Sequence, residues 1–198
     1  MLIPVSTHSQ LTKLGSMPIL AVDMGFSGKS ASCGYAFRAV GDQHSTSKNM
    51  MFAQCSNAVV EQIKKLGNLL LIIEAPLSAA FDSKGNPQSR GSFESTPKPR
   101  WWSLGPGASM SLAAMYFLKR LAAHIPTSHQ CHLVEGYVVG ADSGNDADVA
   151  VALIQAVCSE HKCAWQAPHG HQLVSVLDWV QPGTAGAASP IILIPEFQ

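Results

Sequence analysis

The chain has 198 residues, of which 46% are hydrophobic and only 13% are charged, against about 25% charged in an average soluble protein. This composition predicts a folded protein with a large apolar core and excludes a disordered or charge-rich tail. Thirteen Lys and Arg residues balance thirteen Asp and Glu residues, which excludes a strongly basic protein that coats nucleic acid non-specifically.

The sequence contains no recognisable targeting or membrane-spanning segment. Its most apolar run, 69–73, is far shorter than the roughly 20 apolar residues of a transmembrane helix, and the N-terminus lacks a basic start followed by an apolar stretch. Five cysteines, an odd number, lack the spacing of a disulfide framework, which favours a reducing compartment. We therefore expect a cytoplasmic protein without a membrane partner.

Two cysteines lie close to three histidines near the C-terminal end, which raises the question of a zinc site. Cys158 and Cys163 have the spacing C-x4-C, and His161, His169 and His171 are scattered around them. This arrangement does not match the ligand spacings of structural zinc sites. Buried thiols and surface histidines are the better interpretation.

The first half of the chain predicts mainly strands. After a loose lead-in over 1–16, apolar runs indicate strands, and apolar positions at helical spacing indicate a helix that stops at Gly67-Asn68. The predicted elements are strands at 18–23, 33–40 and 48–53, a helix at 57–66 and a strand at 69–74. The first two strands flank the turn GFSGKSAS and are expected to form a hairpin. The last one, LLLIIE, is typical of a central strand covered on both faces.

The second half begins with a long irregular segment, 75–107, that holds five prolines. Loops of this length are usually functional or disordered. Beyond it we predict helices at 108–124 and 146–161 and strands at 132–139, 173–180 and 191–194. The order of elements predicts an α/β fold with a mixed sheet flanked by helices. One domain over 1–198 is expected, with a core at about 18–160 and C-terminal strands within 172–195.

Acidic residues stand at the ends of the predicted elements. Asp23 ends the first strand, Glu74 ends the central strand, Glu135 lies within a later strand, and Asp146 and Asp148 begin the last long helix. Because neighbouring strands are about 5 Å apart, Asp23 and Glu74 are expected to converge. Clustered carboxylates repel one another unless a cation neutralises them, and carboxylate oxygens are ligands of Mg2+. These acids are therefore candidate metal ligands, and two such ions can support phosphodiester cleavage.

Each of these acids also has a purely structural interpretation, which the sequence leaves open. Asp23 can be a turn former, and Glu74 can simply end a strand before the following Ala-Pro. Asp146 and Asp148 favour a helix N-terminus through the helix dipole, and Asn145 as N-cap would complete a capping arrangement with Asp148. The remaining acid, within its strand, can pair with a basic side chain.

The motifs around three of the acids resemble the RNase H-like superfamily, in particular its RuvC-like resolvase and nuclease branch. They are AVDMGFSGKSASCGYAF around Asp23, LLIIEAPLS around Glu74 and NDADVAVAL around Asp148. The resemblance spans roughly residues 18–160. It implies an RNase H-like fold and a nuclease whose Mg2+ or Mn2+ ions are held by Asp23, Glu74 and Asp148.

The late helix departs from the family pattern in the spacing of its acids. The relatives often carry two acids three residues apart, where this chain has Asn145 and Asp148. Asp146 and Asp148 lie about 200° apart on a regular helix, so both cannot face one site. Asp146, reaching in from a frayed first turn, and Glu135 are therefore second-rank candidates for the metal site. A catalytically weakened relative is an alternative.

Several of the few basic residues lie in predicted loops that follow the acids. Lys29 follows Asp23 in the hairpin turn, and the segment after Glu74 carries three cations beside two tryptophans. Cations contact phosphates and aromatic rings stack on bases, so these are candidate nucleic-acid-binding residues. The complete set is Lys29, Arg90, Lys98, Arg100, Trp101 and Trp102. Alternatively, the segment folds back over the sheet with its tryptophans as a hydrophobic anchor.

The leading hypothesis is a divalent-metal-dependent nuclease that cleaves DNA or RNA. One alternative is a catalytically inactive RNase H-like module that binds nucleic acid or a protein partner. A weaker alternative is a small-molecule phosphohydrolase on the same fold, with 75–107 as a lid. The stretch GFSGKS is not a complete P-loop, because Asp23 stands where the first glycine of that motif belongs. Resolvase relatives act as dimers, so the helix at 108–124 belongs either to the core or to a homodimer interface.

Overall fold

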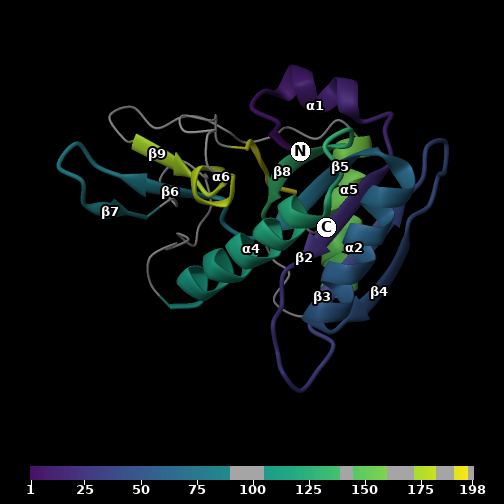
Figure 1. The fold of residues 1–198 in the computed structure, drawn as a ribbon, viewed down its shortest axis with the longest axis horizontal. Helices are drawn as coiled ribbons and strands as arrows, with labels where there is room; N and C mark the ends of the chain where they lie inside the picture. The colour runs from purple at the N-terminus through teal and green to yellow at the C-terminus, as the bar shows by residue number, and fades with distance from the viewer. Residues whose placement is uncertain (90–104, 139–144, 160–171, 182–189, 196–198) are drawn as a thin grey trace.

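The computed structural model describes residues 1–89, 105–138, 145–159, 172–181 and 190–195 (Figure 1). Its helices are α1 (His8–Leu14), α2 (Phe52–Leu66), α4 (Gly105–His124), α5 (Asp146–Cys158) and α6 (Leu177–Val180). Its strands are β1 (Leu2–Pro4), β2 (Ile19–Asp23), β3 (Cys33–Arg38), β4 (Thr46–Met50), β5 (Asn68–Glu74), β6 (Ser78–Phe81), β7 (Pro87–Gln88), β8 (Gln130–Gly136), β9 (Gln172–Ser175) and β10 (Ile192–Leu193). Of the helices in these ranges, none combines the length and the apolar character needed to cross a membrane.

The main sheet has the strand order β1-β8-β5-β2-β3-β4, and β10 also pairs with β8. β1, β10 and β5 run parallel to β8, and β2 runs parallel to β5. β3 and β4 are antiparallel to their neighbours. The sheet is therefore mixed and flanked by helices, as predicted. The β2–β3 hairpin and the interior position of β5 are likewise confirmed.

Alternate residues of the central strands point to opposite faces of the sheet, because side chains in a strand alternate. On β5, Leu69, Leu71 and Ile73 belong to the core beneath α2 and α4. Leu70 and Ile72 belong to the core beneath α5 (Figure 1). All five are fully buried, which explains why this strand is apolar at every position between Asn68 and its terminal acid.

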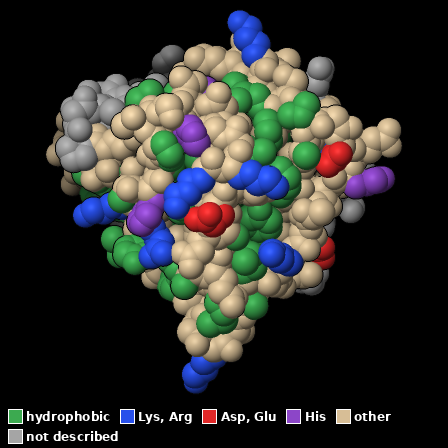
Figure 2. All heavy atoms as spheres, turned by 45° about the vertical axis from the view of Figure 1, so that its right-hand side comes forward, with side chains coloured by type: hydrophobic (Ala, Val, Ile, Leu, Met, Phe, Trp, Pro, Cys, Tyr) green, Lys and Arg blue, Asp and Glu red, His purple; other side chains and the backbone are tan. Residues whose placement is uncertain are grey.

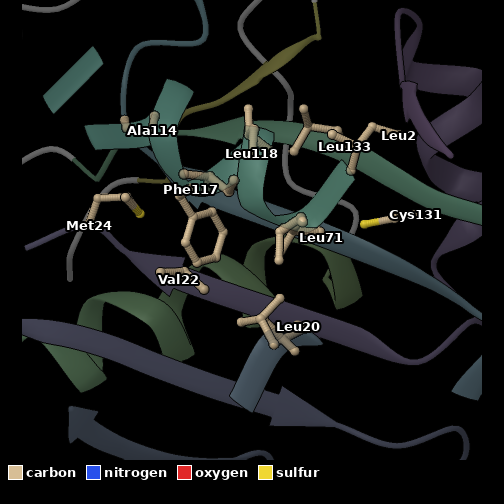
Figure 3. Packing of buried hydrophobic residues seen from close by; sticks show 14 of the residues in the cluster. Leu2, Leu20, Val22, Met24, Leu71, Ala114, Phe117, Leu118, Cys131 and Leu133 are labelled. Atoms are coloured by element: carbon tan, nitrogen blue, oxygen red, sulfur yellow. The ribbon is translucent and has the colours of Figure 1, made fainter. Parts of the chain in front are cut away.

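The larger core lies between the sheet and the pair α2 and α4. In Figure 3, the ring of Phe117 of α4 points toward Val22 of β2, and Leu118, Leu20 and Leu71 belong to the same core. The ring of Phe117 also packs edge-on against Phe52 of α2, with centroids 6.2 Å apart. The predicted helix at 108–124 is thus anchored in the core by one face. Its opposite face is exposed at Leu112 and Tyr116.

The first sixteen residues are ordered parts of the fold, so the expectation of a loose lead-in is wrong. β1 extends the sheet beside β8, with Leu2 opposite Cys131. α1 starts with a capping box, in which the Thr7 hydroxyl accepts from the Gln10 backbone and the Gln10 side chain accepts from the Thr7 backbone. Leu11 is the buried residue of α1 and joins the core beneath α5. The Thr-x-x-Gln motif was a readable sequence signal for this helix.

Replacing Thr7 by alanine is expected to lower the free energy of unfolding by about 1 kcal/mol, because the N-terminal amides of α1 lose their side-chain acceptor. Chemical denaturation measures the change. Thr12→Ala is the matched control, since the Thr12 hydroxyl bonds only to the carbonyl of His8 within the same helix. Equal effects of the two substitutions would show that the capping box does not stabilise the protein.

A small second sheet forms where the sequence predicted an irregular segment. β6 pairs antiparallel with both β7 and β9. The β6–β7 turn is held by Asp82, whose carboxylate accepts from the backbone N–H groups of Lys84 and Asn86 at 2.8 and 2.9 Å. The strand predicted at 173–180 is divided into β9 and the short helix α6.

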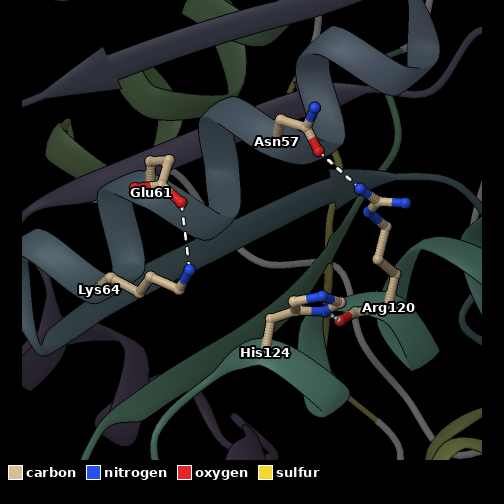
Figure 4. A network of polar contacts seen from close by, with 5 residues as sticks. All are labelled: Asn57, Glu61, Lys64, Arg120 and His124. Atoms are coloured by element: carbon tan, nitrogen blue, oxygen red, sulfur yellow. Dashed lines mark hydrogen bonds and ion pairs between the residues drawn. The ribbon is translucent and has the colours of Figure 1, made fainter.

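Charged side chains on the surface form local contacts. Figure 4 shows Arg120 of α4 donating to Asn57 of α2 at 2.7 Å, and Lys64 pairing with Glu61 at 3.2 Å. On the face drawn in Figure 2, the Lys and Arg side chains of the described residues are separated by uncharged side chains, and near the centre an acidic side chain lies between several of them. This face therefore presents no continuous basic surface in the part of the chain that the structure describes.

Candidate functional site

The carboxyl ends of β2 and β5 bring two of the predicted acids together. β2 and β5 are adjacent parallel strands, and Asp23 is directly opposite Glu74 in their register. Because paired residues of neighbouring strands point to the same face, both side chains lie on the face covered by α5. Both residues are partly buried. The convergence that the sequence predicted for this pair is therefore present.

The start of α5 adds a third acid. Gly34 of β3 is opposite Asp23, and a Cβ atom at Gly34 would lie 1.8 Å from the backbone oxygen of Asp146. The first turn of α5 thus rests directly on β3, next to Asp23. Only a residue without a side chain permits this approach, so Gly34 brings Asp146 to the Asp23–Glu74 pair.

The electrostatics of Asp23 reflect these neighbours. Burial, followed by the negative charges of Glu74 and Asp146, raises the pKa of Asp23 to about 8. Burial also raises the pKa of Asp146. No ion pair between described residues involves Asp23 or Asp146. The arrangement is therefore an acidic cluster in which each added negative charge is unfavourable, and a cation would relieve this repulsion.

The loop between β2 and β3 is tightly closed at its base. A Cβ atom at Gly25 would lie 1.6 Å from the backbone oxygen of Ser32, so the two arms of the loop touch. The Cys33 thiol donates to the Gly25 carbonyl, and a hydrogen bond with Cys55 of α2 holds the pKa of Cys33 below its usual range. These contacts fix the turn that immediately follows Asp23.

Glu135 does not belong to this cluster. It is opposite Ile73 in the β5–β8 register, so it lies on the other face of the sheet from Asp23 and Glu74. It is fully buried, and its carboxylate accepts from the backbone N–H of Leu77 at 2.8 Å. The pairing register thus separates Glu135 from Asp23 and Glu74, with which the sequence had grouped it as a candidate metal ligand.

Asp148 is the helix acid that the resemblance places in the site, but it is exposed. Ala147, Val149 and Ala150 around it are buried against the sheet, and the helix charge that acts on Asp23 is that of Asp146. The structure therefore brings Asp146 to the acidic cluster and leaves Asp148 facing solvent. Successive residues of a helix are about 100° apart, so the side chains of Asp146 and Asp148 are separated by about 200° and cannot both face one site.

The predicted nucleic-acid-binding residues are only partly described. Lys29 is exposed in the β2–β3 loop, on the same loop as Phe26, whose side chain is 48% exposed. Arg90, Lys98, Arg100, Trp101 and Trp102 lie outside the described residues, as do Cys163, His161, His169 and His171 of the rejected zinc site. Cys158 of that set is exposed.

Asn49 is a residue of this region that the sequence did not single out. It is opposite Gly34 in the β3–β4 register, and its side-chain oxygen accepts from the backbone N–H of Ala147 at 2.9 Å. Its amide group donates to Asn145, the N-cap residue of α5. An asparagine in an exposed strand carries no sequence signal for such a contact.

The donor chemistry of the cluster suits Mg2+ or Mn2+, since all three side chains offer carboxylate oxygens. The pKa of Asp23 is raised first by burial and then by the charges of Glu74 and Asp146, and a bound cation would offset the second effect. Within the described residues, however, no three His, Cys, Asp or Glu side chains are already gathered closely enough to hold one ion. Binding of an ion would therefore require these carboxylates to draw together.

No protein-family model, no curated protein and no solved structure matches the chain.

Proposed function

We propose that the protein is a divalent-metal-dependent nuclease of the RNase H-like class that cleaves phosphodiester bonds in DNA or RNA. The observation that carries the proposal is the pairing of Asp23 with Glu74 at adjacent strand ends, with Asp146 brought beside them by α5. The mixed sheet flanked by helices supports it at the level of fold class.

Asp23 and Glu74 would hold the ions, with Asp146 as the third carboxylate. A divalent ion, when bound, supplies Lewis-acid activation of a water molecule and of the scissile phosphate. Asp23 must be ionised for this role, and it loses its proton more readily once a cation offsets the charges of Glu74 and Asp146. Lys29, exposed on the loop that follows Asp23, would contact backbone phosphates.

Asp23→Asn and Glu74→Gln are each expected to reduce metal-dependent cleavage by more than about 100-fold, because loss of even an outer partner of a metal site costs 10–100-fold. Cleavage of labelled single-stranded, double-stranded and branched DNA and RNA with Mg2+ or Mn2+ measures this. Asp146→Asn is expected to impair cleavage and Asp148→Asn to leave it unchanged, since of these two helix acids it is Asp146 whose charge acts on Asp23, while Asp148 is exposed.

Wild-type protein that cleaves none of these substrates with either ion would contradict the proposal. Equal activity of the Asp146 and Asp148 variants would show that α5 does not contribute its first acid to the site.

A non-catalytic binding module is the second candidate, and one observation favours it. The described residues do not yet gather three ligands, and Asn145, where resolvases often carry an acid, serves as the N-cap of α5. Calorimetric titration with Mn2+ separates the two candidates. Saturable binding that Asp23→Asn abolishes supports the nuclease, whereas no binding together with retention of an oligonucleotide supports the module.

A further inference from the structure

Three residues in one row of the sheet lie under the first turn of α5. Asp23 of β2 is opposite Gly34 of β3, and Gly34 is opposite Asn49 of β4. Residues in register across neighbouring strands share one face, so this row runs from the acidic cluster to the edge of the sheet. α5 packs on that same face.

Two contacts fix where α5 begins on this row. The backbone oxygen of Asp146 sits on Gly34, so close that a Cβ there would be 1.8 Å away. One residue further on, the N–H of Ala147 donates to the side-chain oxygen of Asn49 at 2.9 Å. The N-cap residue of the helix, Asn145, is a more distant acceptor for the same N–H, at 3.4 Å. The shorter bond to this N–H is thus supplied by a strand rather than by the helix's own cap.

The amide of Asn49 suits this position because it both donates and accepts. Its oxygen takes the N–H of Ala147 while its NH2 group donates to Asn145. A carboxylate could accept but not donate, and it would add another negative charge beside Asp146. The first N–H groups of a helix lack partners within the helix, so a side chain that bonds one of them ties the helix start to the sheet.

We propose that Asn49 is a positioning residue for the acidic cluster: it holds the first turn of α5 on β3 and β4 so that Asp146 faces Asp23 and Glu74. The consequence for metal binding rests on the proposed function. Asn49 itself is not a ligand in this proposal; it acts through the backbone of α5. The hold on the helix start can be tested without any metal.

The test compares Asn49→Ala with Asn68→Ala. Asn68 also accepts from a backbone N–H, that of Gln130 at 3.0 Å. However, Asn68 is the first residue of β5 and Glu74 is the last, so Asn68 lies at the far end of the strand from the cluster. Each substitution therefore removes an acceptor for a backbone N–H, and Asn49→Ala also removes the bond that Asn49 donates to Asn145. Only Asn49 is near the cluster. The measurements are amide hydrogen exchange of Ala147 by NMR without divalent ions, the thermal unfolding midpoint, and Mn2+ affinity by calorimetry.

Asn49→Ala is expected to exchange the Ala147 amide about fivefold faster than wild type, as loss of one hydrogen bond implies. Its Mn2+ affinity should fall 10–100-fold, as for other residues that orient metal ligands, while its unfolding midpoint stays near that of Asn68→Ala. Asn68→Ala should leave both the Ala147 exchange and the Mn2+ affinity unchanged.

The positioning role is overturned if Ala147 exchange does not change in Asn49→Ala, or if Mn2+ affinity falls equally in both variants. Wild-type protein that binds no Mn2+ instead overturns the proposed function. In that case the exchange rate of the Ala147 amide still decides whether Asn49 holds the start of α5. Faster exchange in Asn49→Ala but not in Asn68→Ala supports this contact, and an unchanged rate in Asn49→Ala contradicts it.

Discussion

Asp23→Asn is expected to stabilise the metal-free protein above pH 8 by about 5 kcal/mol, although it removes a group that the proposed activity needs. The folded-state pKa of Asp23 is about 8, against 3.8 for an unperturbed aspartate. The folded protein therefore keeps a proton that the unfolded chain loses. The stability from this proton is full below about pH 4 and is lost as the pH rises to about 8, a difference of about 5 kcal/mol.

Denaturation in the presence of a chelator, between pH 5 and pH 9, measures this effect. Asparagine mimics the protonated acid, so the advantage of Asp23→Asn over wild type should grow by about 4 kcal/mol across that range. Asp148→Asn, at an exposed acid of α5, is the control and should change stability by less than about 0.5 kcal/mol. An advantage of Asp23→Asn that stays constant with pH would contradict the raised pKa.

The same pair of proteins separates stability from metal binding. Mn2+ at about 100 times its dissociation constant should stabilise wild type by about 2.7 kcal/mol, because the ion binds only the folded state. It should leave Asp23→Asn unchanged. If Asp23→Asn stabilises the metal-free protein and also abolishes its stabilisation by Mn2+, the two results together indicate a site whose carboxylates are held close to one another despite their repulsion.

The sequence predicted the sheet side of this site well, for a physical reason. An apolar run that ends in an acid defines both a buried strand and the position of its last residue. Asp23 and Glu74 end two such runs, and adjacent parallel strands then place them side by side. The β2–β3 hairpin followed from the turn residues between two strands. The hairpin needed no distant contact to be known, whereas the convergence of Asp23 and Glu74 also depended on the pairing of β2 with β5.

Register and helix placement could not be predicted in the same way. Glu135 is an acid in an apolar strand like Asp23, but its pairing with Ile73 turns it to the other face. A shift of one residue in that register would have reversed the outcome. The choice between Asp146 and Asp148 depends on where α5 lies on the sheet, which is set by Gly34 and Asn49 from another part of the chain. Sequence spacing excluded one of the two acids but could not say which.

Gly34→Ala is expected to destabilise the protein by about 3 kcal/mol and to abolish Mn2+ binding. Its new Cβ would lie 1.8 Å from the oxygen, and 2.2 Å from the carbon, of the Asp146 carbonyl. Both are backbone atoms of α5, so a side-chain rotation cannot relieve the overlap and the helix start must move away from β3. Overpacking of a well-packed interior typically costs about 1–3 kcal/mol, and a contact this short belongs at the upper end.

Gly28→Ala is the control, since Gly28 lies in the β2–β3 loop just before the strand that holds Gly34, and a Cβ there meets no atom within 4 Å. Denaturation and Mn2+ calorimetry on both variants separate the contact with α5 from any general effect of replacing a glycine by alanine in this part of the chain. If Gly34→Ala binds Mn2+ as wild type does, Asp146 is not needed at the site and the acidic pair of Asp23 and Glu74 must suffice. If it loses binding while remaining folded, the position of α5 on the sheet is what completes the site, because the substitution removes no carboxylate and displaces only the helix that carries Asp146.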